Sequence, residues 1–465
     1  MHKNKVVAAL KSLTAEELRQ LDKFVRSPVH NQHEEVVRLF QYLRKHLTGG
    51  ERALDKGRVF AHLFPEMEFN MQEIHYLSSY LLKVVEEFLA WQQWRKTTSE
   101  YQISLMRALR LHHLETQFER SFEKAREISN ELKPWDTSNM FFDYQLELER
   151  FNLDRLKTGK LGFRLQQMSN SLDAFFVAEK LRSACILLSN QTITSTSYDT
   201  GLLKPVLNFL ENHSLLENPI VAIYYHAYRT LENQKNSESF QSLKELLNFH
   251  RKSFNINELH DIYIFAINYC IRQLNSGDQA IMGEVFDIYR MGLETDAFVQ
   301  NGIMTPRTYS NIVMSGLKLS EFDWVRNFIQ QYKVSLPEKQ RMGFYNYNLA
   351  RLFYEQKNYS DAMPLLSQME YEDVLLTSLG KVLLAKMQYE QGEFEALSSL
   401  LSSFRIYIQR KKMPGSYHES HLNFIHFLSK LVQRQPSTVD NLASDIASTK
   451  LVAEKDWLIE RANYH

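Results

Sequence analysis

The sequence predicts an all-α protein, an α-α superhelix of helix pairs preceded by an N-terminal helical domain. Two segments near the C-terminus share one residue pattern, which is typical of stacked supersecondary units. Glycine and proline, which interrupt helices, number only 15 and 10 among 465 residues. No useful length of chain alternates apolar and polar residues with the period of a β-strand, so we expect essentially no sheet.

The repeated pattern covers residues 349–366, LARLFYEQKNYSDAMPLL, and residues 384–401, LAKMQYEQGEFEALSSLL. The two segments align without a gap at an offset of 35 residues. Both begin with Leu-Ala, and Tyr354 and Tyr389 each open the string Tyr-Glu-Gln. Proteins built from stacked repeats usually present a surface to a partner, so the repeat bears on function as well as fold.

The overall charge of the chain argues against a general nucleic-acid binder. Lys plus Arg and Asp plus Glu number 55 each, which leaves a net charge of zero. A basic excess is the usual electrostatic signature of nucleic-acid binding. Residues 1–62 hold twelve Lys or Arg against seven Asp or Glu, a local net of +5. This imbalance alone is too small to indicate nucleic acid.

Cysteine content and hydropathy predict a soluble protein of a reducing, cytoplasmic compartment. Cys185 and Cys270 are the only two cysteines, and both lie in apolar helical sequence. We expect buried free thiols rather than a disulfide framework. The apolar run at residues 6–10 is shorter than the core of a secretion signal. No run has the roughly 18 apolar residues of a membrane helix.

Residues 1–98 are expected to form the N-terminal helical domain. Thr14 and Glu17 make a capping box at the start of one helix, and the Pro after Ser27 ends it. Asn70 is the expected N-cap of a long helix reaching about Lys96. Two further helices are expected between these, over about 34–46 and around 59–64.

Residues 99–300 are expected to be a divergent helical-repeat region, 301–412 the regular repeats, and 413–465 capping helices. Helix-pair spacing in the divergent region is near 35–40 residues, but its residues match the later repeats poorly. The helices expected there are 102–132, 138–157, 162–190, 202–212, 218–233, 237–251, 257–274 and 278–293. Helices at about 417–434 and 437–463 are expected to cap the array with a polar outer face.

The segments at 301–412 resemble tetratricopeptide repeats, helix-turn-helix units of about 34 residues. The positions that carry the resemblance are Leu349, Ala350, Phe353, Tyr359, Ala362 and Leu366, then Leu384, Ala385, Gln388, Phe394, Leu397 and Leu401. A third copy supplies Ile312, Val313, Gly316, Phe322, Val325 and Ile329. The sequence departs from the family where Asn346 and Gln388 replace large residues, and in spacings of 37 and 35. The whole chain also resembles a bacterial helical-repeat protein of uncharacterised function.

The resemblance implies binding of a protein or peptide by first-helix residues that do not pack. On this chain those residues are Arg307, Met314, Phe344, Tyr347, Arg351, Tyr354, Val382, Lys386 and Tyr389. Arg and Lys interleaved with Tyr suit an acidic, partly apolar segment or a C-terminal carboxylate. The alternative is that Tyr347, Tyr354 and Tyr389 only pack against neighbouring repeats.

No residue pattern in the sequence indicates a metal, cofactor or catalytic site. His418 and His421 are one helical turn apart, with His426 offset, but metal sites on helices usually add a carboxylate. Four cations cluster at the end of one expected helix, where positive charge complements the helix dipole: Arg405, Arg410, Lys411 and Lys412. We therefore expect no metal, no cofactor and no enzymatic activity.

Two functions are compatible with these observations. The first is a non-catalytic scaffold or adaptor that binds a protein or peptide in the concave groove of residues 301–412. In that case the N-terminal domain supplies a second surface or an oligomer contact. The alternative is a transcriptional or signalling regulator, whose residues 1–62 contact nucleic acid while the repeats sense a peptide or protein. An enzyme with its site between helices is a third, weaker hypothesis.

Overall fold

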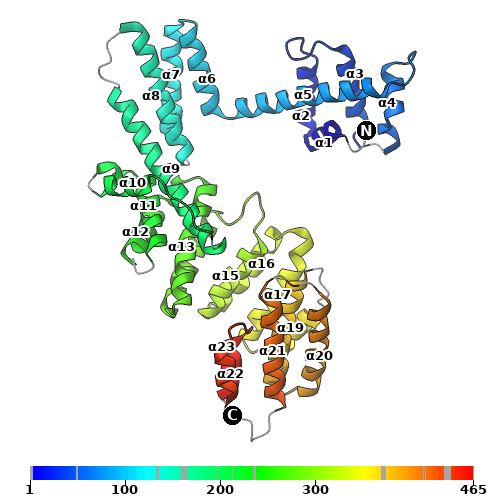
Figure 1. Ribbon diagram of the computed structural model, residues 1–465, viewed down its shortest axis with the longest axis vertical. Helices are drawn as coiled ribbons and strands as arrows, with labels where there is room; N and C mark the ends of the chain where they lie inside the picture. The colour runs from blue at the N-terminus through cyan, green and yellow to red at the C-terminus, as the bar shows by residue number, and fades with distance from the viewer. Residues whose placement is uncertain are drawn as a thin grey trace. The chain divides into compact units, whose positions relative to one another are not determined.

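The computed structural model describes residues 4–48, 51–131, 136–158, 165–194, 196–211, 213–233, 237–367, 373–411, 413, 415–433 and 441–463. Within these ranges the chain is a succession of helices, each packed against its neighbours, and its one β-bridge joins Gln300 and Ile303. The prediction of an all-α superhelix of packed helix pairs is confirmed (Figure 1). Lys412 and the parts of predicted helices at 132, 162–164, 212, 434 and 437–440 lie outside the described residues.

The chain divides into two compact units. The first comprises Met1–Leu132 and Ser138–Asp173, and the second comprises Lys133–Thr137 and Ala174–His465. The described part of each unit has its own buried apolar residues. The second unit contains all of the repeated segments.

The N-terminal part of the first unit is a cluster of helices around one core. Its helices are α1 (Lys5–Ser12), α2 (Ala15–Val25), α3 (Glu34–His46), η1 (Glu51–Leu54), α4 (Lys56–Leu63) and α5 (Met71–Lys96). The predicted capping box is present: the Thr14 hydroxyl accepts from the Glu17 amide, and Glu17 accepts from the Thr14 amide. Asn70 caps α5 as predicted, accepting from the amides of Gln72 and Glu73.

The rest of the first unit departs from one predicted helix. The interval 102–132 was expected to be continuous, but the structure has α6 (Thr98–Leu111) and α7 (Glu115–Glu131). His113 adopts a left-handed conformation with φ 56°, which ends one helix and reverses the chain direction. Helix α8 (Thr137–Thr158) follows, and α9 (Leu165–Thr194) continues past the boundary between the units.

The second unit continues with helices that pack consecutively. These are α10 (Leu203–Leu210), η2 (Ser214–Glu217), α11 (Pro219–Glu232), α12 (Ser237–His250), η3 (Arg251–Ser253), α13 (Ile256–Asn275), η4 (Gln279–Ile281) and α14 (Met282–Glu294). Helix α11 packs against α12 and α13, α13 against α14, and α14 against α15. Asn218 caps α11 and Asn255 caps α13, so short polar side chains mark the start of these two helices.

The repeated segments form two rows of helices. The helices are α15 (Pro306–Lys318), α16 (Phe322–Gln331), η5 (Tyr332–Ser335), α17 (Glu338–Glu355), α18 (Tyr359–Ser367), α19 (Val374–Gln391), α20 (Phe394–Arg410) and α21 (Tyr417–Val432). Helices α15, α17, α19 and α21 pack each against the next, and α16, α18 and α20 pack between consecutive members (Figure 1). We call the side of the first row that carries Lys318, Arg351, Lys386 and Glu390 the first-helix face.

The C-terminal segment contains two helices where one was expected. The predicted helix 437–463 is instead α22 (Leu442–Ser448) and α23 (Lys455–Asn463). The helix breaks because Thr449 is extended and Glu454 is left-handed, with φ 51°. Helix α23 packs against α21, and Trp457, Leu458 and Ala462 enter the core shared by α19, α20 and α21.

Candidate functional site

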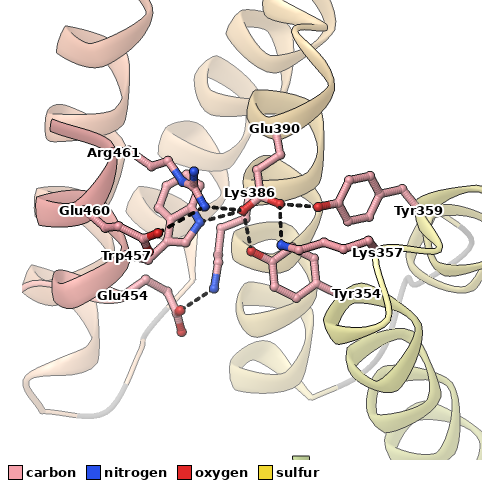
Figure 2. Close-up of polar contacts among 9 residues, drawn as sticks. All are labelled: Tyr354, Lys357, Tyr359, Lys386, Glu390, Glu454, Trp457, Glu460 and Arg461. Carbon is pink, nitrogen blue, oxygen red and sulfur yellow. Dashed lines mark hydrogen bonds and ion pairs between the residues drawn. The ribbon is translucent and has the colours of Figure 1, made fainter. Parts of the chain in front are cut away.

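The densest polar cluster that involves the predicted partner-binding residues lies on the first-helix face, where α17, α18 and α23 all contribute side chains around Glu390 of α19. Figure 2 shows Glu390 of α19 between Tyr354, Lys357 and Tyr359 on one side and Trp457 and Arg461 on the other. Tyr354 comes from the end of α17, Lys357 from the turn that follows it and Tyr359 from the start of α18, whereas Trp457 and Arg461 come from α23. The site therefore joins the last two repeats to the C-terminal helix.

Both carboxylate oxygens of Glu390 accept hydrogen bonds. Its Oε1 accepts from the Tyr354 hydroxyl at 2.7 Å and from the Trp457 indole N–H at 2.8 Å. The Arg461 guanidinium lies 3.4 Å from the same oxygen. Its Oε2 accepts from the Tyr359 hydroxyl and from the Lys357 ammonium, the latter at 3.3 Å. A buried carboxylate is tolerated when its lone pairs are matched in this way.

These contacts decide the charge state of Glu390. Burial of the carboxylate, whose side chain is 8% exposed, acts to raise its pKa. The hydrogen bonds from Tyr359, Trp457 and Tyr354, with the charge of Lys357, outweigh burial and lower the pKa of Glu390 to about 2. Burial and the adjacent Glu390 charge raise the pKa of Tyr354, so its hydroxyl remains a donor. Glu390 is therefore a fixed anion at neutral pH.

A second link joins α19 to the residue before α23. Lys386, which is 8% exposed, places Nζ 2.6 Å from Oε2 of Glu454. The same ammonium lies over the ring of Tyr354 at 4.8 Å and the ring of Trp457 at 5.5 Å from their centroids. Lys386 thus has a carboxylate and two aromatic faces around it, an arrangement that satisfies a desolvated cation.

Glu454 lies in the field of cations from three consecutive first-row helices. Burial acts to raise its pKa, but Lys386 and then Arg351 and Lys318 lower it below the usual range. Arg351 and Lys386 occupy equivalent repeat positions, 35 residues apart. Arg351 also lies over the ring of Tyr347 at 5.7 Å. The first-helix face therefore combines positive charge with aromatic surface.

The nine predicted partner-facing residues differ in burial. Tyr347, Tyr354, Val382 and Lys386 are buried, Phe344, Arg351 and Tyr389 are half-buried, and Arg307 and Met314 are exposed. Tyr354, Lys386 and Tyr389 meet at the C-terminal segment, where Trp457 stands edge-on to Tyr389 at 5.5 Å. Phe344 packs against the apolar cluster that contains Tyr347 and Tyr354, and Arg351 and Tyr347 lie in the field of Glu454. Arg307 lies instead near Tyr289, whose pKa its charge acts to lower.

Sequence reasoning missed Glu390, Glu454, Trp457 and Arg461. Glu390 stands inside the duplicated Tyr-Glu-Gln string, yet its counterpart Glu355 is exposed, so the repeat gave no reason to single it out. The other three lie in a segment predicted only to cap the array. The four-residue spacing of Trp457 and Arg461 is a detectable helical signal, although it does not reveal the partner helix.

The histidines singled out in the sequence do not converge. His421 is buried, with Nδ1 2.6 Å from the Tyr417 carbonyl, whereas His426 is exposed beside Phe427. Burial lowers the pKa of both rings, and Lys430 and Arg405 lower that of His426 further. Throughout the part of the chain that the structure describes, no group of three or more His, Cys, Asp or Glu side chains is placed to hold a metal ion.

Part of the positive charge in the N-terminal helices is paired. Arg26 and Arg44 lie 3.2 and 3.8 Å from Asp22. Arg38 pairs with Glu35, and Lys96 with Glu17. These ion pairs reduce the number of cations available to a polyanion on this surface.

In the described ranges, no helix has both the length and the apolar character needed to cross a bilayer. The chain matches no protein-family model, no curated protein and no solved structure. The fold and the first-helix face are therefore the observations on which function must be argued.

Proposed function

We propose that this protein is a non-catalytic, tetratricopeptide-like scaffold or adaptor that binds a protein or peptide on its first-helix face. One observation carries the proposal: this face already holds the segment of α23. Lys386 and Glu390 of α19 contact Glu454 and Trp457 of that segment. Tyr354 of α17 and Tyr359 of α18 hold Glu390 from the other side. Grooves formed by helices commonly accept an amphipathic helix from a partner. The proposal includes the reducing cytoplasmic compartment expected from the two free, buried cysteines.

The chemistry of the face favours a partner segment with acidic and aromatic groups. Arg351 and Lys386 provide cations, and Tyr347, Tyr354 and Tyr389 provide rings. Met314, which is 41% exposed on α15, extends the face beyond the part that α23 covers. A segment bound along the row would therefore contact α15 and α17 as well as α19.

The test is position-specific photo-crosslinking in cells that produce the full chain. A photoreactive amino acid replaces Met314 on α15, and in a matched control it replaces Ile406 on α20, which is similarly exposed at 48%. We expect a crosslinked partner from position 314 and not from position 406, and its loss when Arg351→Ala is added. Identical bands from both positions, or none from position 314, would reject the first-helix face as the binding surface.

A further inference from the structure

The C-terminal segment places three side chains of different chemistry on the first-helix face. The Glu454 carboxylate contacts Lys386, the Trp457 indole contacts Glu390 and Tyr389, and the Arg461 guanidinium contacts Glu390. Glu454 directly precedes α23, and Trp457 and Arg461 are four residues apart on it, so these two lie along one side of the helix. The intervening acidic residues, Asp456 and Glu460, are exposed.

Each of these side chains meets a complementary group of the repeats. The acidic residue meets the cation of Lys386 in the field of Arg351 and Lys318. The aromatic residue meets the Tyr389 ring, the Lys386 ammonium and the Glu390 carboxylate. The basic residue meets Glu390, the fixed anion. The first-helix face thus offers a cation to an acidic side chain, an anion to a basic side chain, and an aromatic surface with a hydrogen-bond acceptor to an indole.

We propose that the partner segment is a short helix directly preceded by an acidic residue. An aromatic residue follows the acidic one by three positions, and a basic residue lies four positions after that. Glu454, Trp457 and Arg461 are then an internal substitute for this segment, and the partner replaces α23 on Lys386 and Glu390. This inference rests on the proposed function and specifies the chemistry of the partner.

The balance of forces at the site permits such an exchange. Ion pairs and hydrogen bonds in buried positions give specificity more than net stability, because desolvation offsets their attraction. A competing helix with the same groups restores every polar contact that α23 gives up on Glu390 and Lys386. The remaining cost is exposure of the apolar side of α23, chiefly Leu458 and Ala462, which pack in the core around α21.

The test uses the full chain and a fluorescein-labelled synthetic peptide of residues 450–463, read by fluorescence anisotropy. In one variant, Glu454→Ala, Trp457→Ala and Arg461→Ala remove the internal side chains while α23 stays in the chain. We expect the peptide to bind this variant at least about tenfold more tightly than the wild type, a difference of about 1.4 kcal/mol. Adding Lys386→Met and Glu390→Gln to the variant should abolish that gain.

Two controls make the outcome specific, and a single-residue variant serves if the triple variant does not fold. A peptide with Ala at the three positions should not bind, and Lys430→Ala, on the exposed surface of α21, should leave the affinity unchanged. Equal affinity of the peptide for the wild type and the triple variant would overturn the inference. If the triple variant fails to melt cooperatively, peptide affinity is measured on the single variant Arg461→Ala instead. It should raise peptide affinity about twofold to fivefold, and an unchanged affinity would equally overturn the inference.

The proposed scaffold function and the proposed three-residue pattern can be rejected independently of each other. A partner crosslinked at position 314 with no peptide binding would leave the scaffold function standing and remove the three-residue pattern. Peptide binding without a cellular crosslink at position 314 would reject the first-helix face as the cellular binding surface and leave the three-residue pattern as a property of the purified chain.

Discussion

The indole N–H of Trp457 donates to Oε1 of Glu390 at 2.8 Å, across 67 positions of sequence. This contact ties the C-terminal helix to the last regular repeat. Tyr354 donates to the same oxygen from the preceding repeat, so one carboxylate couples three parts of the second unit. The predictions below test how much stability and specificity such contacts contribute.

Glu390→Gln should destabilise the protein at neutral pH by up to about 3 kcal/mol, because a pKa near 2 instead of 4.5 reflects preferential stabilisation of the anion. Since the folded-state pKa is lowered, this contribution is complete above about pH 4.5 and disappears as pH falls through 2. The difference in unfolding free energy between wild type and variant should therefore shrink over that window in denaturant titrations.

Glu258→Gln is the matched comparison for this pH dependence. Glu258 accepts hydrogen bonds from Thr137 and Tyr224, but burial dominates and raises its pKa. A raised carboxyl pKa disfavours the anion in the folded state, so wild-type stability relative to this variant should rise as pH falls toward 4.5. If the difference in unfolding free energy from the wild type changed with pH in the same direction for both variants, the assignment of Glu390 as a stabilised anion would be contradicted.

Lys386 and Glu454 should show a measurable coupling. In a double-mutant cycle with Lys386→Met and Glu454→Gln, we expect an interaction energy of about 1 kcal/mol in unfolding free energy. The value is modest because the Glu454 side chain is 44% exposed. The control pair, Arg26 and Asp22, lies one turn apart on the surface and should couple by less than about 0.5 kcal/mol. Coupling no larger than that of the control would show that Glu454 is not held by Lys386.

Gly316→Ala should destabilise the second unit by about 1–3 kcal/mol. A Cβ at Gly316 would lie 2.5 Å from Cγ2 of Val325, so α15 and α16 would have to separate. Gly283→Ala is the control: its Cβ would meet nothing within 4 Å, and helix propensity should stabilise the protein by up to about 1 kcal/mol. Thermal melts of both variants would compare their changes in Tm. Equal changes in Tm would argue against a tight α15–α16 contact.

The thiols of Cys185 and Cys270 should resist alkylation in the native protein. Both are fully buried, and burial raises the pKa of Cys270 to about 12 and that of Cys185 further. Iodoacetamide labelling at pH 8, followed by mass spectrometry, should proceed only as fast as the chain opens. Rapid labelling of either residue without denaturant would show that its surroundings open easily.

The parts of the fold that were predicted from the sequence depend mostly on residues that are close to one another along the chain. The Thr14–Glu17 capping box and the Asn70 cap are made by residues close in sequence, so their hydrogen bonds could be read directly. The breaks at His113 and Glu454 were missed because a left-handed residue that is neither Gly nor Asn carries no local signal. The candidate site was predicted in part, since Tyr354 and Lys386 were selected but Glu390 and Trp457 were not.

The sequence by itself determined the helical class, the repeat of 35 residues and the placement of Arg351 and Lys386 at equivalent positions, because these depend on composition and period. Only the tertiary structure decided that Glu454 and Trp457 cover Lys386 and Glu390. Those contacts join residues 68 and 67 positions apart. Helical periodicity shows which side chains share a face of one helix, whereas the partner of that face depends on how the whole array and its C-terminal helix pack.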